Sequence, residues 1–351
     1  MKKKHLNRQQ LWRIQKIQED YAARAERKAK GNAEILDVGS PDESSNEQAL
    51  NELGPEEKGL VISHFGQQLD VEALDGDRAG EIVRCHQRSN LKRLVTGDHV
   101  IWRRGEPTGI IVAGLKRSSL LQRPDKNADL KPVAANIDIV IIVIAPEPES
   151  HANLIDRYLV AAENSQLSSL ILLNKVDMLN KENRQQLEGL LNSYAALSYP
   201  TLQVSSKTGF GLEALQKRLQ GQTSIFVGQS GVGKSALINA LLPGVNTLEG
   251  SLSSARAKGR HTTTSARLFH FPAGGDLIDS PGIREFGMWH MSPEEVFRGF
   301  KEFSDYAGRC KFRDCKHDQE PDCAFKLAVE QGKIQPRRMQ SYQQILQSLD
   351  E

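Results

Sequence analysis

The stretch SIFVGQSGVGKSALINAL, residues 224–241, decides the fold of this 351-residue chain. An apolar run leads into Gly-x-x-x-x-Gly-Lys-Ser at residues 228–235, and a helix-forming run follows it. Glycines let the backbone wrap around phosphate groups, with its N–H groups pointing at the anion from a helix N-terminus. A chance glycine-rich turn is the alternative. Because a strand precedes the loop and a helix follows it, we predict a nucleoside triphosphate site.

Within this loop, Lys234 would reach the β- and γ-phosphates and take part in catalysis, and the Ser235 hydroxyl would ligate Mg²⁺. The loop itself does not identify the base. The residues expected to contact the nucleotide here are Gly228, Gln229, Ser230, Gly231, Val232, Gly233, Lys234, Ser235 and Ala236.

Two further segments predict which base is bound. Residues 174–177 (NKVD) directly follow the apolar run 170–173 and resemble the N-K-x-D motif of GTPases. A carboxylate at Asp177 can accept hydrogen bonds from N1–H and the exocyclic amine of guanine, whereas adenine has neither donor there. A helix-entry turn capped by Asp177 is the alternative. Residues 205–207 (SSK) resemble the S-A-K motif, so guanine contacts are expected from Asn174, Lys175, Val176, Asp177, Ser205, Ser206 and Lys207.

The segment after the phosphate loop carries candidate switch residues. Asp279-Ser-Pro-Gly282 resembles D-x-x-G, in which Asp279 would hold Mg²⁺ through water and Gly282 would sense the γ-phosphate. Thr262 and Thr263 are candidate Mg²⁺ ligands, with Thr263 preferred, although a threonine run leading into a strand is the plainer interpretation.

One group expected of a rapid GTPase is missing from the sequence. Ras-like GTPases place a glutamine directly after the D-x-x-G glycine to orient the attacking water, but this chain has Ile283 there. Hydrolysis should therefore be slow unless another group or a partner completes the site. His261 is the best catalytic candidate in the chain, and a structural hydrogen-bonding role for it is an equal alternative.

Apolar periodicity predicts two kinds of domain. Short β-like runs at 60–65, 81–85, 99–102 and 109–113 predict a small barrel; an OB-type barrel fits the length, although other small barrels remain open. From residue 139, a continuous apolar run and then alternating strands and helices predict a doubly wound α/β domain. After Phe286 the pattern is helical and contains cysteines.

Charge is unevenly distributed along a chain whose formal net charge is only +2. Residues 1–30 carry ten Lys/Arg against three acidic residues, residues 34–58 carry eight acidic residues against one lysine, and residues 78–131 are basic again. Two basic blocks favour a polyanionic partner such as RNA, although a solvated tail and barrel surface would have the same composition.

Three of the four cysteines cluster near the C-terminus. Cys310, Cys315, His317 and Cys323 form a Cys₃His set, which suits one tetrahedral, structural Zn²⁺. Cys85 stands apart, and we expect it to be a buried barrel residue. The N-terminus lacks a secretory apolar run, and the apolar run 139–145 is too short to span a bilayer, so a cytoplasmic protein without membrane contact is expected.

The order of these motifs is circularly permuted, because NKVD and SSK precede the phosphate loop and DSPG. Together with the basic barrel before them and the Cys/His cluster after them, this order resembles the small ribosomal subunit biogenesis GTPases, the RsgA or YjeQ family. The resemblance implies an OB barrel at 59–120, a permuted GTPase domain at 121–286 and a helical zinc-binding domain at 287–351. Residues 1–58 are not diagnostic of the family; their composition predicts a disordered or partly helical basic tail followed by an acidic linker.

The resemblance also implies a monomer that binds GTP, GDP and the rRNA of the 30S subunit late in assembly, and whose hydrolysis the subunit stimulates. A nucleotide-gated RNA-binding module and a regulatory GTPase with a protein partner remain alternatives. Because DSPG leads directly into the C-terminal segment, loss of the γ-phosphate contact could reposition that segment.

Overall fold

The computed structural model describes residues 53–65, 68–89, 91–124, 130–243, 266–279, 291–313, 315–317 and 320–349. Contacts divide the chain into two compact units. The first comprises Met1–Leu120, Pro132–Asn136 and Ser265–Leu268, and the second comprises Leu121–Lys131, Ile137–Thr264 and Phe269–Glu351. Most of the predicted tail, residues 1–52, lies outside the described residues.

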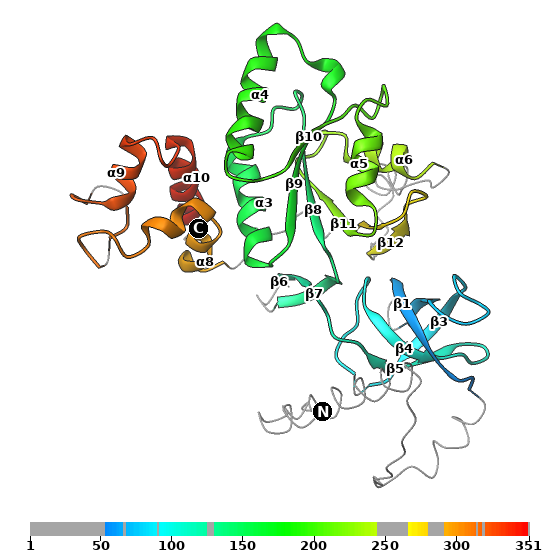
Figure 1. Ribbon diagram of the computed structural model, residues 1–351. Helices are drawn as coiled ribbons and strands as arrows, with labels where there is room; N and C mark the ends of the chain where they lie inside the picture. Colours follow the sequence, from blue (N-terminus) through cyan, green and yellow to red (C-terminus); the bar gives the residue numbers. More distant parts are fainter. Residues whose placement is uncertain are drawn as a thin grey trace, which may run out of the picture. The chain divides into compact units, whose positions relative to one another are not determined.

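Five strands of the first unit close into a barrel (Figure 1). In order around the barrel they are β1 (Glu56–Phe65), β2 (Gln68–Ala73), β3 (Ile82–Gln87), β5 (Gly109–Gly114) and β4 (His99–Arg103). The β3–β5 pair is parallel and the other pairs are antiparallel. Strand β4 pairs back onto β1, from Glu56↔Arg103 to Leu60↔His99, and this closes the ring. The predicted barrel is therefore confirmed.

The barrel interior is filled by alternate side chains of its strands. Every second residue of β2 and β5 is buried, as the two-residue period of a strand requires. Trp102 is fully buried, and a Cβ atom on Gly59 would lie 2.8 Å from its ring, so the glycine makes room for the indole. Cys85 is buried as predicted, and burial raises the pKa of its thiol to about 12.

The second unit contains a parallel sheet with helices on both faces. Its parallel strands lie in the order β10 (Thr201–Gln203), β9 (Ser168–Leu173), β8 (Ile139–Ile144), β11 (Thr223–Val227) and β13 (Asp276–Asp279). Strand β12 (Arg267–His270) is next in the strand order, beside β13. Helices α3 (Ala152–Asn164) and α4 (Lys181–Ala195) lie on one side of it, and α5 (Leu212–Leu219) and α6 (Lys234–Leu241) on the other (Figure 1). A two-stranded sheet, β6 (Leu120–Pro124) with β7 (Leu130–Ala135), stands apart from it.

The strand order reverses direction between β8 and β11. The chain builds outward from β8 through β9 to β10, and then returns to place β11 on the other side of β8. In open parallel sheets, ligands bind beside the carboxyl ends of the strands at such a reversal. The phosphate loop at 228–235 begins directly after β11, so the topology puts it at this point.

Among the described residues, four helical segments follow the sheet in the second unit. They are α8 (Pro293–Arg298), η3 (Lys301–Tyr306), α9 (Ala324–Glu330) and α10 (Pro336–Gln347). Their aromatic core includes Phe300, Phe303 and Tyr342, and it also contains Val160 from α3. The C-terminal helices therefore share a hydrophobic core with α3, a helix that packs against the parallel sheet.

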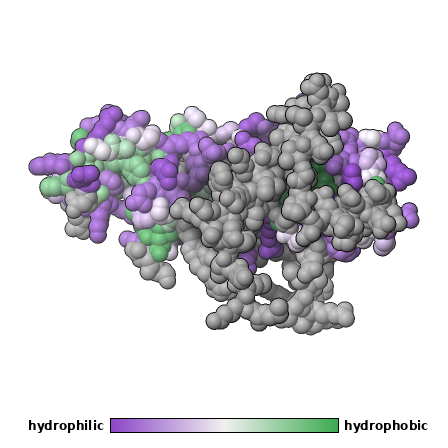
Figure 2. All heavy atoms as spheres, turned by 90° about the horizontal axis from the view of Figure 1, so that it is seen from below, coloured by the Kyte–Doolittle hydropathy of each residue, from purple (hydrophilic) through white to green (hydrophobic). Residues whose placement is uncertain are grey.

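The described surface is predominantly polar on the face shown in Figure 2. Large apolar side chains are exposed at separate elements, namely at Leu74, Ile82, Leu130, Met178, Phe210, Phe312 and Leu327. Scattered apolar residues of this kind are normal on folded proteins. Among the described residues, none of the helices has the length and apolar character that a membrane span requires.

Gly299 provides a test of the packing between α3 and the C-terminal helices. A Cβ atom there would lie 2.5 Å from Val160 Cγ1 and 2.7 Å from Val160 Cα, so Gly299→Ala should cost about 1–3 kcal/mol of unfolding free energy. Gly189→Ala is the control, because Gly189 lies within α4 with open space around it and should gain about 0.5–1 kcal/mol. Thermal unfolding measures the stability of both variants. Equal shifts of the melting temperature in the two variants would contradict the close packing of Gly299 against Val160.

Candidate functional site

Three glycines of the phosphate loop have positive φ, and at two of them a neighbouring segment also lies too close for a side chain. Gly228 has φ = 138°, and a Cβ atom on it would lie 2.3 Å from the carbonyl oxygen of Val143 on β8. Gly233 has φ = 94°, and its Cβ atom would lie 2.4 Å from Asn174 Nδ2. These glycines therefore permit both the left-handed turns and the close approach of neighbouring segments.

Lys234 lies at the first position of α6, where the loop ends. Its Nζ donates to the carbonyl oxygens of Gly228 and Gln229, each at 2.7 Å, so the ammonium group lies against the loop backbone. Val232, a residue of the loop, is fully buried in the hydrophobic core beside the sheet, and this packing anchors the loop. Ser235 and Ala236 form the first turn of α6.

Asn174 joins the three predicted nucleotide-binding segments. It is fully buried at the end of β9, its Nδ2 donates to the Val232 carbonyl at 3.0 Å, and its Oδ1 accepts from the Ser206 backbone N–H at 3.3 Å. Segments separated by more than fifty positions in the sequence are thereby held together at one edge of the sheet.

Lys175 adopts the left-handed conformation, with φ = 60°, and its Nζ donates to the Gly231 and Glu147 carbonyl oxygens, both at 2.8 Å. The contact with Glu147, in the segment after β8, was not predicted. It goes to a backbone carbonyl, which leaves no signal in the sequence.

Asp177 lies in the short helix η1 (Val176–Met178), with its carboxylate exposed to solvent at this edge. Ser205 Oγ donates to Asp177 Oδ1 at 2.6 Å and accepts from the Thr208 backbone N–H at 3.1 Å. The hydrogen bond from Ser205 is the main reason why the pKa of Asp177 is lowered, with a smaller contribution from the charge of Lys207. Asp177 is therefore held as a carboxylate in a fixed orientation.

Asp279 ends β13, which runs parallel to β11, so the carboxyl ends of both strands lie at the same edge of the sheet. The other predicted switch and catalytic residues, His261, Thr262, Thr263, Gly282 and Ile283, lie outside the described residues.

The Cys/His cluster assembles within the C-terminal helical region. The ligand atoms of Cys310, Cys315, His317 and Cys323 all lie within 4.8 Å of one another. Cys310 Sγ lies 3.4 Å from His317 Nδ1 and 3.9 Å from Cys323 Sγ, which are separations that tetrahedral ligands about 2.0–2.3 Å from a common ion would have. Burial lowers the pKa of His317, which favours the neutral imidazole that binds metals. The four residues thus form a possible zinc site.

Comparison with known proteins agrees with the topology. A family model described as RsgA GTPase matches residues 114–289. The chain is 57% identical over 352 aligned residues to the small ribosomal subunit biogenesis GTPase RsgA of Ectopseudomonas mendocina, covering all of this chain and 99% of that protein. The chain belongs to the RsgA GTPase family. The RsgA of Azotobacter vinelandii is 56% identical to this chain over the same aligned length. Members of this family are GTP hydrolases.

Solved structures of RsgA-type proteins share the fold. YjeQ from Thermotoga maritima matches with a TM-score of 0.70 and 34% identity, covering 84% of this chain and 99% of that one. YloQ, described as a circularly permuted GTPase, matches with a TM-score of 0.67 and 26% identity, covering 84% of this chain and 96% of that one. The permuted GTPase fold predicted from the motif order is therefore confirmed.

The Asn174 contacts lead to a prediction that does not depend on nucleotide. Asn174→Ala leaves the Val232 carbonyl and the Ser206 N–H without their partner, and a buried group left unpaired costs about 1–3 kcal/mol. Chemical denaturation should therefore show a clear loss of stability. Ser206→Ala is the control, because the contact uses its backbone N–H; equal losses in both variants would contradict this role of Asn174.

Proposed function

We propose that the edge of the sheet around Asn174 binds GTP. The guanine would be recognised by Asn174, Lys175, Val176, Asp177, Ser205, Ser206 and Lys207, and the phosphates by residues 228–236. The fixed carboxylate of Asp177 supports this assignment, because its two oxygens can accept from both donors of guanine.

Hydrolysis would use charged and polar groups from the phosphate loop and from the two switch segments. Lys234 neutralises charge on the β- and γ-phosphates, and the Gly282 N–H contacts the γ-phosphate. Ser235, Thr263 and Asp279 supply hydroxyl and carboxylate oxygens, the ligands that Mg²⁺ prefers, and the ion neutralises phosphate charge when bound. His261 acts on the attacking water in place of the glutamine absent at Ile283, so turnover is slow until a partner completes the site.

We further propose that the chain acts in maturation of the small ribosomal subunit, binding the 30S particle and its rRNA as a monomer in the cytoplasm. The observation that carries this proposal is the 57% identity to a small ribosomal subunit biogenesis GTPase, over the whole of this chain.

The barrel supports the proposal of an RNA partner. Its strand order, with β4 closing onto β1 and β3 parallel to β5, is consistent with an OB-type barrel, a fold that binds oligonucleotides. Arg84, Arg104 and Arg117 form ion pairs with carboxylates of the barrel. Lys92 and Arg93 are exposed between β3 and β4, where they could contact phosphates. In this layout the barrel spans 59–120, the GTPase domain 121–286 and the zinc-binding domain 287–351. The predicted boundary between tail and barrel falls inside β1, which already begins at Glu56 and pairs there with Arg103 of β4.

The Cys₃His cluster is proposed to hold one structural Zn²⁺. Three thiolates and an imidazole complete a tetrahedral set, which leaves no open position for catalysis. The local helices are short: α9 has seven residues and α8 has six, so they depend on their shared core and on the ion.

Metal analysis tests this proposal. We expect one zinc ion per chain, and a lower melting temperature after chelation, because the binding energy of a structural ion is folding energy. Cys315→Ser should lose the zinc, whereas Cys85→Ala should keep it, because Cys85 lies in the barrel. Equal zinc content in both variants would exclude the cluster.

GTP hydrolysis measured with and without purified 30S subunits tests the function. We expect slow turnover alone and strong stimulation by the subunit. His261→Ala should lower the stimulated rate about a hundredfold, as loss of a general acid or base does, while GDP affinity stays within about twofold. The exposed residue His151, which makes no side-chain capping bond to α3, provides the control variant His151→Ala. Binding of 30S without stimulation would favour a nucleotide-gated RNA-binding module instead.

A further inference from the structure

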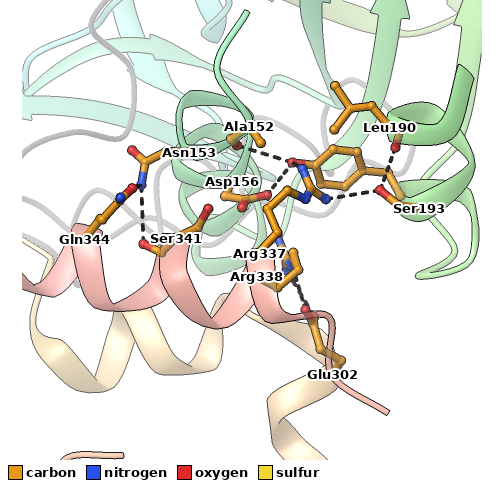
Figure 3. Close-up of polar contacts among 11 residues, drawn as sticks. Ala152, Asn153, Asp156, Leu190, Ser193, Glu302, Arg337, Arg338, Ser341 and Gln344 are labelled. Carbon is orange, nitrogen blue, oxygen red and sulfur yellow. Dashed lines mark hydrogen bonds and ion pairs between the residues drawn. The ribbon is translucent and has the colours of Figure 1, made fainter. Parts of the chain in front are cut away.

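A buried acidic side chain lies in the middle of α3. Asp156 has no exposed surface. It lies in an otherwise apolar part of the helix, because six of the eight residues from Ile155 to Ala162 are apolar and buried. Its partner is Arg338 of α10, which is also fully buried, with Nη1 2.6 Å from Asp156 Oδ1. Arg338 also binds Glu302 of η3, through Nε at 2.6 Å and Nη2 at 3.0 Å. Figure 3 shows these three side chains pointing toward one another from three different elements.

Further polar contacts from α4 and α10 surround this ion pair. Tyr194 of α4 donates its hydroxyl hydrogen to Asp156 Oδ1, and Arg337 donates to the Tyr194 oxygen at 3.1 Å. Asn153, one turn before Asp156, donates to Gln344 Oε1 at 3.0 Å (Figure 3). Helix α10 is therefore held against α3 by directional contacts as well as by the shared apolar core.

The energetics of this pair favour a role in orientation. Removing two charges from water costs free energy, and their attraction offsets this cost only where the partners are well placed. Replacing a buried ion pair by apolar residues of similar volume therefore often leaves the stability of a protein unchanged. Asp156 Oδ2 has no hydrogen-bond partner, so the carboxylate depends on the contacts made by Oδ1. The network therefore specifies one position of α10 on α3.

The opposite side of α3 reaches the phosphate loop. Tyr158 is 4% exposed; burial raises the pKa of its phenol, and a hydrogen bond from the backbone of Gly228, the first residue of the loop, offsets part of that rise. Successive helical residues are rotated by about 100°, so Asp156 and Tyr158 project to opposite sides of one helical turn. A displacement of α3 at Asp156 must therefore also displace Tyr158.

We propose that α3 couples the C-terminal helices to the phosphate loop, with Tyr158 as a positioning residue for Gly228 and the Asp156–Arg338 pair as its anchor. Docking of α10 fixes α3, and Tyr158 then holds Gly228 against Val143. Nucleotide binding and the seating of α10 thereby stabilise each other, because coupling between two sites is reciprocal. This inference rests on the proposed nucleotide site.

A double-mutant cycle on GDP affinity, measured by titration with a fluorescent guanine nucleotide, tests the coupling. Tyr158→Phe should weaken GDP binding about fivefold, the equivalent of one hydrogen bond of about 1 kcal/mol. Arg338→Met should weaken it severalfold in the wild-type background and much less in the Tyr158→Phe background. Additive effects, or unchanged affinity in both single variants, would overturn the proposal.

Two further variants separate coupling from simple loss of folding. Lys301→Met removes a partly exposed ion pair between η3 and Glu163 of α3, so it should leave GDP affinity unchanged. If Arg338→Met does not fold, Arg338→Lys can replace it, because lysine keeps the charge but lacks the planar guanidinium that binds both carboxylates. Its effect on GDP affinity should also be non-additive with that of Tyr158→Phe, but smaller.

Thermal unfolding provides a readout that a merely structural role would not move. GDP should raise the melting temperature of the wild type more than that of Arg338→Met, at equal ligand concentration. Equal shifts would contradict the coupling. A wild-type chain that binds no guanine nucleotide would instead overturn the proposed nucleotide site.

Discussion

The proposed nucleotide-binding edge of the sheet depends on the hydrogen bonds of one buried side chain, that of Asn174. A single amide, with no exposed surface, bonds the phosphate loop through the Val232 carbonyl and the next loop along through the Ser206 N–H. These segments come from opposite halves of the permuted order, so no local sequence preference could hold them together. The side chain and the backbone of Gly233 are so close that only glycine fits there. The geometry of the phosphate loop and the proposed recognition of the base thus depend on the same buried side chain.

Most of the α/β fold could be predicted because its signals are local. The apolar run at β8 is buried at every residue, and α6 begins at Lys234, where a helix-forming run was predicted to follow the phosphate loop. The Cys/His cluster was also predictable, since its four members fall within fourteen residues. Strand β2 was missed although Leu69, Val71 and Ala73 alternate with polar residues, which is a recognisable two-residue period.

The contacts between distant segments could not be predicted. Arg338 looks like any surface arginine in a helix that also contains Arg337 and several glutamines, and only tertiary packing buries it. The one available signal was an acidic residue, Asp156, inside an apolar helical run. Contacts made to backbone atoms, such as those of Lys175 with Glu147 and of Tyr158 with Gly228, depend on where a carbonyl or amide lies rather than on residue identity. The predicted movement of the C-terminal segment at DSPG stays a prediction, because residues 280–290 lie outside the described part of the chain.

The separation of Asp156 from Arg338 has a consequence for the order in which the chain can fold during its synthesis. The two residues are 182 positions apart, and the phosphate loop lies between them. While the ribosome is still adding the last helices, α3 carries a carboxylate without its cation and an apolar surface without its cover. Domains fold as units during translation, beginning with their N-terminal parts. The sheet can form early, but the face of α3 that receives α10 stays open to solvent until translation has passed Arg338.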